Sequence, residues 1–455
     1  MGSMSRFYLL SSLFVCCIIA RAWAVDSIDT RLDNWHQWRG PLASGVAPRG
    51  NPPVRWSETE NIRWKTEIPG HGSSTPIVYG DQVFLLTTIR TDHTSASRPV
   101  PRAVLQPAGP NGRPLRLPPA PTHIFHFMVL SIDRQTGKVL WRRTATEQVP
   151  HRGHHRDHGY ASGSPTTDGR RLYASFGSQG LFCYDLDGNL KWSRDLGRME
   201  IYSDYGEAVT PVVHRDTVVV VHDHLGQSAI FALDARSGQT KWKRDRDEQA
   251  GWSTPLIVDR DGAVQVICAG ANRIRSYDLA TGQVVWECGG LSLATVSSPI
   301  SAGNFVFCMT AYPQSVLLAL PLDATGDITG TDKVVWQRDR DTSYVPSALI
   351  VRDTLFFTKM NSPILTALDV RTGDTIVSTE RLRGLSGNIY ASPVAVAGRI
   401  YFTTRGGATA VLRHGAQLEQ LALNKLDDAV DASPAIVGSQ LFMRGKKYLY
   451  CIEEQ

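Results

Sequence analysis

The chain has 455 residues, of which 48 are basic and 43 acidic, and its formal net charge is +5. Without the first 24 residues, which contain Arg6 and Arg21 but no acidic residue, 46 basic and 43 acidic residues remain, a net charge of +3. So small an excess over this length argues against nucleic acid and against an anionic membrane surface as partners.

The first 24 residues have the pattern of a secretory signal peptide. Arg6 gives a positive start, residues 7–20 are apolar, and Ala22-Trp23-Ala24 is a small-x-small cleavage site. The alternative is an uncleaved anchor, but the apolar run is short for a membrane span and the rest of the chain has no other candidate. The residues before Cys16 lack the small side chain of a lipoprotein signal. We therefore expect an exported protein without a transmembrane segment, periplasmic or secreted.

Residues 25–60 show no convincing strand pattern. They contain Trp35, Trp38 and a Pro-containing stretch at 51–54. We expect an ordered N-terminal arm whose tryptophans pack on the main body.

A unit with the spelling Asp-x-x-Thr-Gly-x-x-x-Trp recurs along the rest of the chain. It is clearest at residues 278–286 and returns at 133–141 and, with Ser237 in place of Thr, at 234–242. An Asp that bonds nearby backbone N–H groups and a Gly that supplies positive φ indicate strand, tight turn, strand. Incomplete copies occur at 185–192, at 323–336 with an insertion before the Trp, and at 369–373 without the Trp. A period of 40 to 50 residues indicates a repeat fold.

A second marker, Ser or Thr followed by Pro, opens an apolar strand in each unit. After the first interval the prolines are 41 to 47 residues apart, and proline at the first residue of a strand loses no needed hydrogen bond. Each marker is followed by strand, turn, strand, loop and the hairpin. This order predicts an all-β, eight-bladed β-propeller of four-stranded antiparallel blades over residues 61–455. The last unit lacks a fourth strand. Residues 62–66 have a strand pattern but precede the first unit, so we expect this N-terminal strand to complete the last blade. The markers are Thr75, Ser164, Thr210, Thr254, Ser298, Ser392 and Ser433, and in the sixth unit Ser347 follows its proline in an inverted marker.

An insertion interrupts the first blade at residues 88–121. It is rich in Pro and Arg and cannot bury enough apolar area for a core. We interpret it as a solvated loop, with a lid as the alternative.

The repeated unit resembles the PQQ-like β-propeller repeat over residues 61–453. The segment Trp35-His36-Gln37-Trp38-Arg39-Gly40-Pro41 also resembles the start of secreted bacterial PQQ-like repeat proteins. The resemblance implies that each Trp docks between neighbouring blades. More distant relatives are the PQQ-dependent alcohol dehydrogenases, which hold the quinone and Ca²⁺ under a vicinal disulfide, and the BamB-type outer-membrane assembly factor, a non-catalytic scaffold. The chain departs from the dehydrogenases because its only adjacent cysteines lie in the signal peptide, so the repeats do not by themselves imply bound PQQ.

Histidines gather in two segments that we expect at the top face, where loops enter each blade. The loop 144–163 and the strand end 221–224 supply imidazoles and carboxylates, the ligands of Zn²⁺, Cu²⁺ or Fe²⁺. The alternative is a hydrogen-bonded polar rim. The candidate metal ligands are His154, His155, His158, His222, Asp223 and His224, with His151 beside them.

Acidic residues recur in two patterns. Arg-Asp-Arg-Asp at 244–247 and 338–341 follows the docking Trp in two blades, which favours inter-blade ion pairs over a site. The acids of the last inter-blade loop could act as acid and base or hold Ca²⁺, although capping turns would explain them equally well. These acids are Asp427, Asp428 and Asp431, with Glu207 at the corresponding place of an earlier blade.

The remaining top loops carry basic and aromatic residues that would line a funnel. Such a funnel could hold an anionic or sugar-like ligand by charge and stacking. Its predicted residues are Tyr160, Glu207, Trp252, Arg273, Tyr344, Lys359, Tyr390, Arg405 and Asp431.

Five cysteines follow the signal peptide, an odd number without the CxxC spacing of a zinc site or the pattern of a disulfide framework. We expect buried free thiols at Cys183, Cys268, Cys288, Cys308 and Cys451.

The sequence contains no recognised catalytic constellation. The leading hypothesis is an exported binding or scaffolding propeller of the cell envelope, which engages a protein, peptide or carbohydrate at its funnel and which we expect to be a monomer. The alternative is a metal- or PQQ-dependent oxidoreductase acting on alcohols or sugars. No cofactor is certain; the candidates are a transition metal, Ca²⁺ and PQQ.

Overall fold

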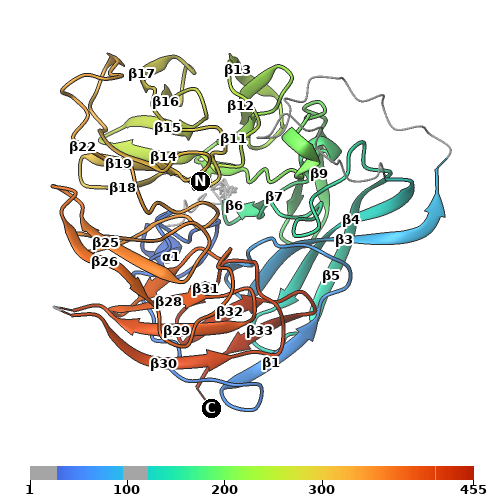
Figure 1. The fold of residues 1–455 in the computed structure, drawn as a ribbon. Helices are drawn as coiled ribbons and strands as arrows, with labels where there is room; N and C mark the ends of the chain where they lie inside the picture. The colour runs from blue at the N-terminus through green and yellow to red at the C-terminus, as the bar shows by residue number, and fades with distance from the viewer. Residues whose placement is uncertain (1–27, 96–120, 416, 455) are drawn as a thin grey trace, which may run out of the picture.

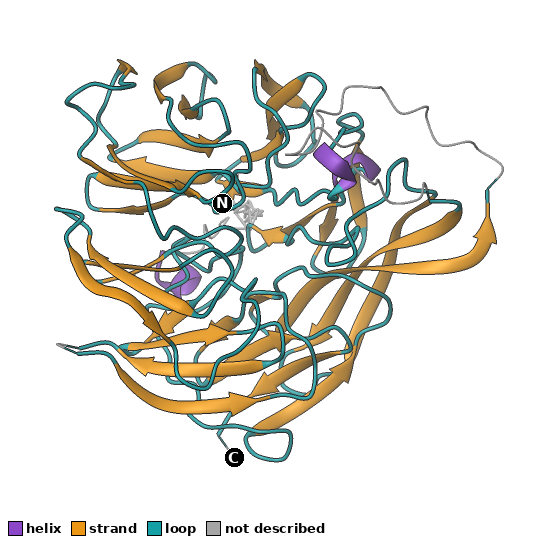
Figure 2. Ribbon diagram, in the orientation of Figure 1, coloured by secondary structure: helices purple, strands orange, loops and turns teal. Residues whose placement is uncertain are grey.

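The protein is an all-β, eight-bladed propeller, as predicted. The computed structural model describes residues 28–95, 121–415 and 417–454. Eight antiparallel sheets follow one another in chain order around a ring (Figure 1), and nearly all regular structure is strand (Figure 2). The expected signal peptide, residues 1–24, lies outside the described residues. Among the helices of the described part, none has the length and apolarity needed to cross a membrane.

Each blade is a meander whose first strand lies nearest the ring axis. The first three blades contain β2 (Ile77–Tyr79), β3 (Gln82–Thr94), β4 (His123–Asp133) and β5 (Val139–Gln148); β6 (Thr166–Thr167), β7 (Arg171–Ser175), β8 (Leu181–Asp185) and β9 (Leu190–Arg194); and β10 (Val212–His214), β11 (Thr217–His222), β12 (Ser228–Asp234) and β13 (Thr240–Arg246). The fourth and fifth contain β14 (Leu256–Arg260), β15 (Ala263–Ala269), β16 (Ile274–Asp278) and β17 (Val284–Cys288), then β18 (Ile300–Ala302), β19 (Phe305–Thr310), β20 (Val316–Pro321) and β22 (Trp336–Arg338). The last three contain β23 (Leu349–Val351), β24 (Thr354–Thr358), β25 (Ile364–Asp369) and β26 (Thr375–Arg381); β27 (Val394–Val396), β28 (Arg399–Thr403), β29 (Ala408–Arg413) and β30 (Glu419–Lys425); and β31 (Ala435–Val437), β32 (Gln440–Arg444) and β33 (Tyr448–Ile452).

The N-terminal strand closes the ring, as predicted. Strand β1 (Ile62–Glu67) pairs antiparallel with β33 and becomes the fourth strand of the last blade. Figure 1 shows the two strands, from opposite ends of the chain, side by side. This pairing satisfies the outer edge of β33, which would otherwise expose unpaired backbone groups.

The repeated hairpin forms because its residues satisfy the turn locally. In the clearest copy, the Asp278 carboxylate accepts hydrogen bonds from Thr281 N–H at 2.8 Å and Thr281 Oγ1 at 2.6 Å. Gly282 has φ +69°, and an added Cβ would lie 2.6 Å from the Trp242 ring of the preceding blade. The Trp242 indole N–H in turn donates to Leu279 O at 2.8 Å. Glycine is therefore required both by the turn and by the tryptophan that packs on it.

The docking of each Trp on the next blade is confirmed in five seams. Trp64, Trp141, Trp192, Trp242 and Trp336 each donate the indole N–H to a carbonyl oxygen of the next blade's hairpin. Trp286 differs, since it is fully buried and donates to the Gln265 side chain of its own blade. The insertion that follows Asp323 explains this: it forms β21 (Gly326–Asp327), which pairs parallel with β17 as a fifth strand of the fourth blade.

The Ser/Thr-Pro markers form a hydrogen-bonded belt around the axis. In seven of the eight seams, the backbone N–H of a marker donates to the hydroxyl of the next blade's marker at 2.9–3.2 Å. The bond from Ser433 N–H to Thr75 Oγ1 crosses the point of ring closure. The hydroxyl thus explains why Ser or Thr precedes the proline: it joins neighbouring blades at their innermost strands.

Residues that precede β1 pack on the propeller. Helix α1 (Ile28–Leu32) begins the described residues, and the residues that follow it bond to the innermost strands of several blades. Trp35 is fully buried and pairs with Val78, while Ala47 N–H donates to Ala395 O. The Arg39 guanidinium, 3% exposed, donates to Pro393 O at 2.6 Å and Ala348 O at 2.5 Å. The arm therefore fastens blades that are distant in sequence.

The expected insertion at 88–121 begins with strand. β3 continues to Thr94, which pairs with His123 of β4, so the first blade ends in a long hairpin. Residues 96–120 lie outside the described residues, and the predicted loop there stays a prediction. The five cysteines are free and buried, as expected.

Candidate functional site

The candidate site is a funnel on the ring axis at the top face. It encloses a cavity of about 370 Å³ to which most blades contribute. Six of the belt residues line it near the axis, and aromatic rings form its walls: Trp38, Tyr205, Trp252, Tyr344 and Tyr390. Trp38 comes from the N-terminal arm, so the arm contributes to the site as well as to the fold.

The structure brings together about half of the predicted funnel residues. Trp252, Tyr344, Tyr390 and Asp431 line the cavity, and Arg405 contacts two of its acidic residues. The other four predicted residues lie elsewhere. Arg273 binds Asp327 of the added strand β21 at 2.7 Å, Lys359 binds Asp341 at 2.9 Å, and Tyr160 and Glu207 line a separate cavity.

A charged triad holds one wall of the funnel. The Arg405 guanidinium binds the Asp431 carboxylate with two contacts of 2.6 and 3.1 Å and reaches Asp157 at 3.1 Å. It also lies 4.3 Å from the centre of the Tyr390 ring. Burial raises the pKa of Asp157, but the charge and hydrogen bond of Arg405 and the charges of His155 and Arg156 together outweigh burial, so the net pKa is lowered. The pKa of Arg405 is raised by its two carboxylates despite its burial. The charges of Asp157 and Arg405 therefore persist together across the neutral pH range.

An aromatic groove continues from the funnel toward the rim. It has a volume of about 260 Å³ and shares Tyr205, Trp252 and Tyr344 with the funnel. Tyr205 is 38% exposed and Tyr312 is 41% exposed. Tyr205 follows η2 (Tyr202–Asp204), where Ser203 and Asp204 both have positive φ. Positive φ at two non-glycine residues costs free energy and is often found at functional sites. Sequence reasoning missed Tyr205 because nothing in the pattern predicts this turn.

The predicted metal ligands do not form one cluster. Among the described residues, no three His, Cys, Asp or Glu side chains are placed to hold a metal ion. His155 and His158 line the funnel, while the His154 and His158 imidazoles contact the carbonyls of the residues that follow them at 2.8 Å. His224 Nδ1 accepts Glu200 N–H at 3.2 Å. These contacts correspond to the hydrogen-bonded rim that the sequence left as the alternative.

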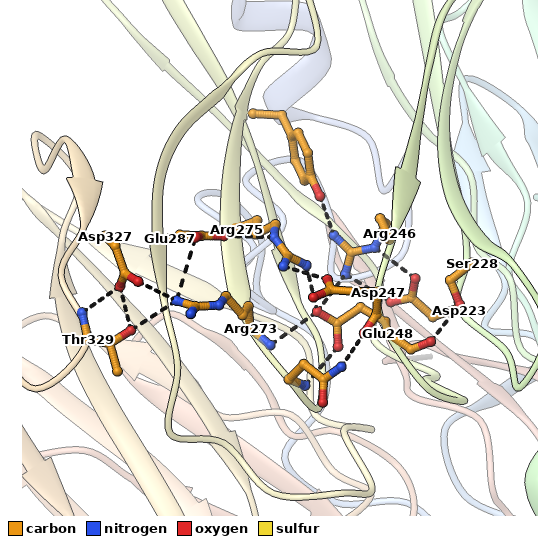
Figure 3. A network of polar contacts seen from close by, with 12 residues as sticks. Asp223, Ser228, Arg246, Asp247, Glu248, Arg273, Arg275, Glu287, Asp327 and Thr329 are labelled. Carbon is orange, nitrogen blue, oxygen red and sulfur yellow. Dashed lines mark hydrogen bonds and ion pairs between the residues drawn. The ribbon is translucent and has the colours of Figure 1, made fainter.

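Asp223 belongs to an ion-pair network at the seam of the third and fourth blades (Figure 3). Its carboxylate holds the fully buried Arg246 guanidinium at 2.8 and 3.0 Å. Across the seam, Arg275 of the fourth blade contacts Asp247 of the segment at 2.5 Å and the adjacent Glu248 at 2.9 Å. The inter-blade ion pairs predicted from the Arg-Asp-Arg-Asp segment are confirmed here. The Asp223 carboxylate, a predicted metal ligand, binds Arg246 instead. In the second segment, Asp341 binds Lys359 of the next blade at 2.9 Å.

Among the acids of the last inter-blade loop, Asp428 is a capping residue. Its carboxylate accepts backbone N–H groups from Lys446, Lys447 and Tyr448 at 2.9–3.1 Å. Only Asp431 of this group reaches the funnel. The capping explanation therefore holds for Asp428.

Glu207 is the most perturbed acid near the site. It accepts Ser178 N–H and Ser178 Oγ, both at 2.6 Å, and lies in a cavity of about 20 Å³ with Tyr160 and His151. Burial raises its pKa to about 7, against the opposing effect of the two hydrogen bonds. Glu207 ties the loop that carries Tyr205 to the neighbouring blade and does not face the funnel.

Glu207 gives a pH-dependent prediction. Between pH 4.5 and 7 the folded protein holds a proton here that the unfolded chain has released, so this group's contribution to the free energy of unfolding falls as pH rises, by at most about 3 kcal/mol. Glu207→Gln should therefore be more stable relative to wild type at pH 8 than at pH 5. Urea unfolding of both proteins at the two pH values measures this difference. Glu147→Gln, at a 58% exposed side chain, is the control. An unchanged difference between wild type and Glu207→Gln at the two pH values would contradict the assignment.

Comparison with known proteins identifies similar chains. A family model described as outer membrane protein assembly factor BamB matches residues 126–379, more than half of the chain. The outer membrane protein assembly factor BamB of Yersinia pestis is 26% identical over 224 residues, 47% of this chain and 52% of the relative. The chain thus spans about half the length of the curated relative that it matches.

Solved structures share the fold. BamB from Moraxella catarrhalis aligns with a TM-score of 0.51 and 15% identity, over 74% of this chain and 95% of that one. The quinohemoprotein alcohol dehydrogenase from Comamonas testosteroni aligns with a TM-score of 0.59 and 11% identity, over 95% of this chain and 82% of that one. At these identities the similarity establishes architecture only.

Proposed function

Because the chain belongs to the family of outer membrane protein assembly factor BamB, we propose that it is an exported binding and scaffolding propeller of the cell envelope. It holds its partner at the top-face funnel and catalyses no reaction there. The observation that carries this proposal is the funnel itself: an aromatic-walled cavity on the axis of a closed ring, with its charged groups paired to one another. The name of the family, an assembly factor, supports a scaffold role. Export to the periplasm or beyond rests on the predicted signal peptide.

The alternative, a metal- or PQQ-dependent oxidoreductase, draws its support from the shared propeller fold alone. Ca²⁺ takes six to eight oxygen ligands. The funnel offers the carboxylates of Asp157 and Asp431, and both are bound to Arg405. The described residues of the funnel therefore do not fit a Ca²⁺-quinone site.

Association with isolated cell envelopes tests the proposal without assuming the class of partner. The purified protein should bind, saturably, to envelopes from the cells that produce it. Trp252→Ala with Tyr344→Ala should weaken binding at least tenfold, because aromatic anchors in a pocket contribute most of an interface's free energy. The matched control removes two exposed apolar side chains of outer strands, Leu190→Ala with Ile376→Ala. Equal binding by both double variants, or turnover of an alcohol or sugar by the wild type, would contradict the proposal.

A further inference from the structure

The funnel contains hydroxyl groups whose protons have no acceptor within the protein. Seven of the eight belt hydroxyls accept a backbone N–H group, Thr254 being the exception, and in the described residues none of the eight donates a hydrogen bond to a protein atom. Five that line the cavity are at most 8% exposed: Thr75, Ser164, Thr210, Ser392 and Ser433. Buried hydroxyl donors normally find a partner. Their arrangement around one axis therefore supplies a set of O–H donors to whatever occupies the funnel.

The wall of the funnel supplies the complementary acceptors. The Asp157 and Asp431 carboxylates face the same cavity, and each retains lone pairs beyond its contact with Arg405. No lysine or arginine is among the described residues that line the cavity. The ligand thus meets donors near the axis, acceptors at one wall, and aromatic faces at Tyr205, Trp252 and Tyr344.

We propose that the funnel binds the end of a neutral saccharide. Sugar hydroxyls both donate and accept, so one ring can satisfy the belt hydroxyls and the two carboxylates together, while its C–H face packs on an aromatic ring. An anionic ligand would be repelled by Asp157 and Asp431. A cationic ligand would compete with Arg405, which already occupies both carboxylates. A peptide anchor side chain prefers an apolar pocket base, and here the base is a ring of hydroxyls. The cavity, about 370 Å³, lies within the range of about 300–1,000 Å³ for small-ligand sites.

This inference rests on the proposed function, and its test separates the two. Envelopes are treated either with periodate, which cleaves vicinal diols and so destroys sugar rings, or with proteinase K. Binding of the wild-type protein should fall at least tenfold after periodate and persist after proteinase K. The reverse pattern overturns the saccharide proposal and leaves the binding propeller standing. Absence of any binding that depends on Trp252 and Tyr344 overturns both.

Thr254 provides a variant that tests the hydroxyl ring directly. It lines the funnel, but its hydroxyl takes part in none of the belt bonds, while its backbone N–H donates to Ser298 Oγ at 2.9 Å. Valine has nearly the same shape as threonine, so Thr254→Val removes one O–H donor and leaves the backbone bond to Ser298 in place. We expect binding to proteinase-treated envelopes to weaken about threefold to tenfold, an unchanged thermal unfolding midpoint, and near wild-type binding by Thr254→Ser. Wild-type binding by Thr254→Val would overturn the role of the ring.

Discussion

Acidification from pH 7 to pH 4 is expected to unfold the protein. Three histidines, His36, His158 and His222, are held neutral by the fold, and burial is the main cause of their lowered pKa values of about 3, 4 and 4. Below pH 6.5 the unfolded chain takes up protons that these groups cannot accept in the folded protein. Their contribution to stability is therefore complete above pH 6.5 and is lost as pH falls toward 4. Each group lowers the free energy of unfolding by about 3 kcal/mol at pH 4. This is a large share of the free energy of unfolding of a typical protein, about 5–15 kcal/mol.

The measurement is the midpoint of acid unfolding by circular dichroism. His222→Gln should move the midpoint to lower pH, because the buried ring, 3% exposed and packed 5.7 Å from the Phe231 ring centre, no longer has to be charged. The exposed His93→Gln serves as control. A midpoint that is the same in all three proteins would show that buried histidines do not limit acid stability.

The fold was predictable because its signals are local and repeated. Asp278, Thr281 and Gly282 satisfy a turn among themselves, and the same spelling recurs at the period of a blade. The seam tryptophans follow from the same unit. Trp286 shows the limit: its different contact depends on the fifth strand β21, which arises from an insertion with no repeat to compare.

The site was only partly predictable because it is assembled from distant loops. Trp252, Tyr344 and Tyr390 were expected at the top face from their position in the repeat, and they line the funnel. The pairing of Arg405 with Asp157 joins two loops that are about 250 residues apart, and no sequence spacing encodes it. The belt hydroxyls were visible as a marker, but their contribution to the cavity depends on ring closure.

Asp223→Ala is expected to be the most destabilising single substitution in the seam network. The Arg246 side chain is fully buried, and the substitution removes the carboxylate that binds its guanidinium at 2.8 and 3.0 Å (Figure 3). Removing one partner of a buried ion pair costs about 3–5 kcal/mol, since the remaining charge is desolvated without compensation. Tyr277 Oη at 2.7 Å and Glu248 at 3.9 Å remain near Arg246 and keep the loss toward the lower end of that range.

Urea unfolding of two further variants separates the charge effect from a general loss of packing. Asp245→Ala, in the same Arg-Asp-Arg-Asp segment, removes a 64% exposed carboxylate that contacts Lys243 and should change stability by less than about 1 kcal/mol. Asp223→Leu combined with Arg246→Met removes both charges and should recover most of the stability that Asp223→Ala loses, because an apolar pair needs no desolvated charge. If the double variant is instead less stable than Asp223→Ala alone, the seam depends on the hydrogen bond from Arg246 to Tyr277 more than on charge neutralisation.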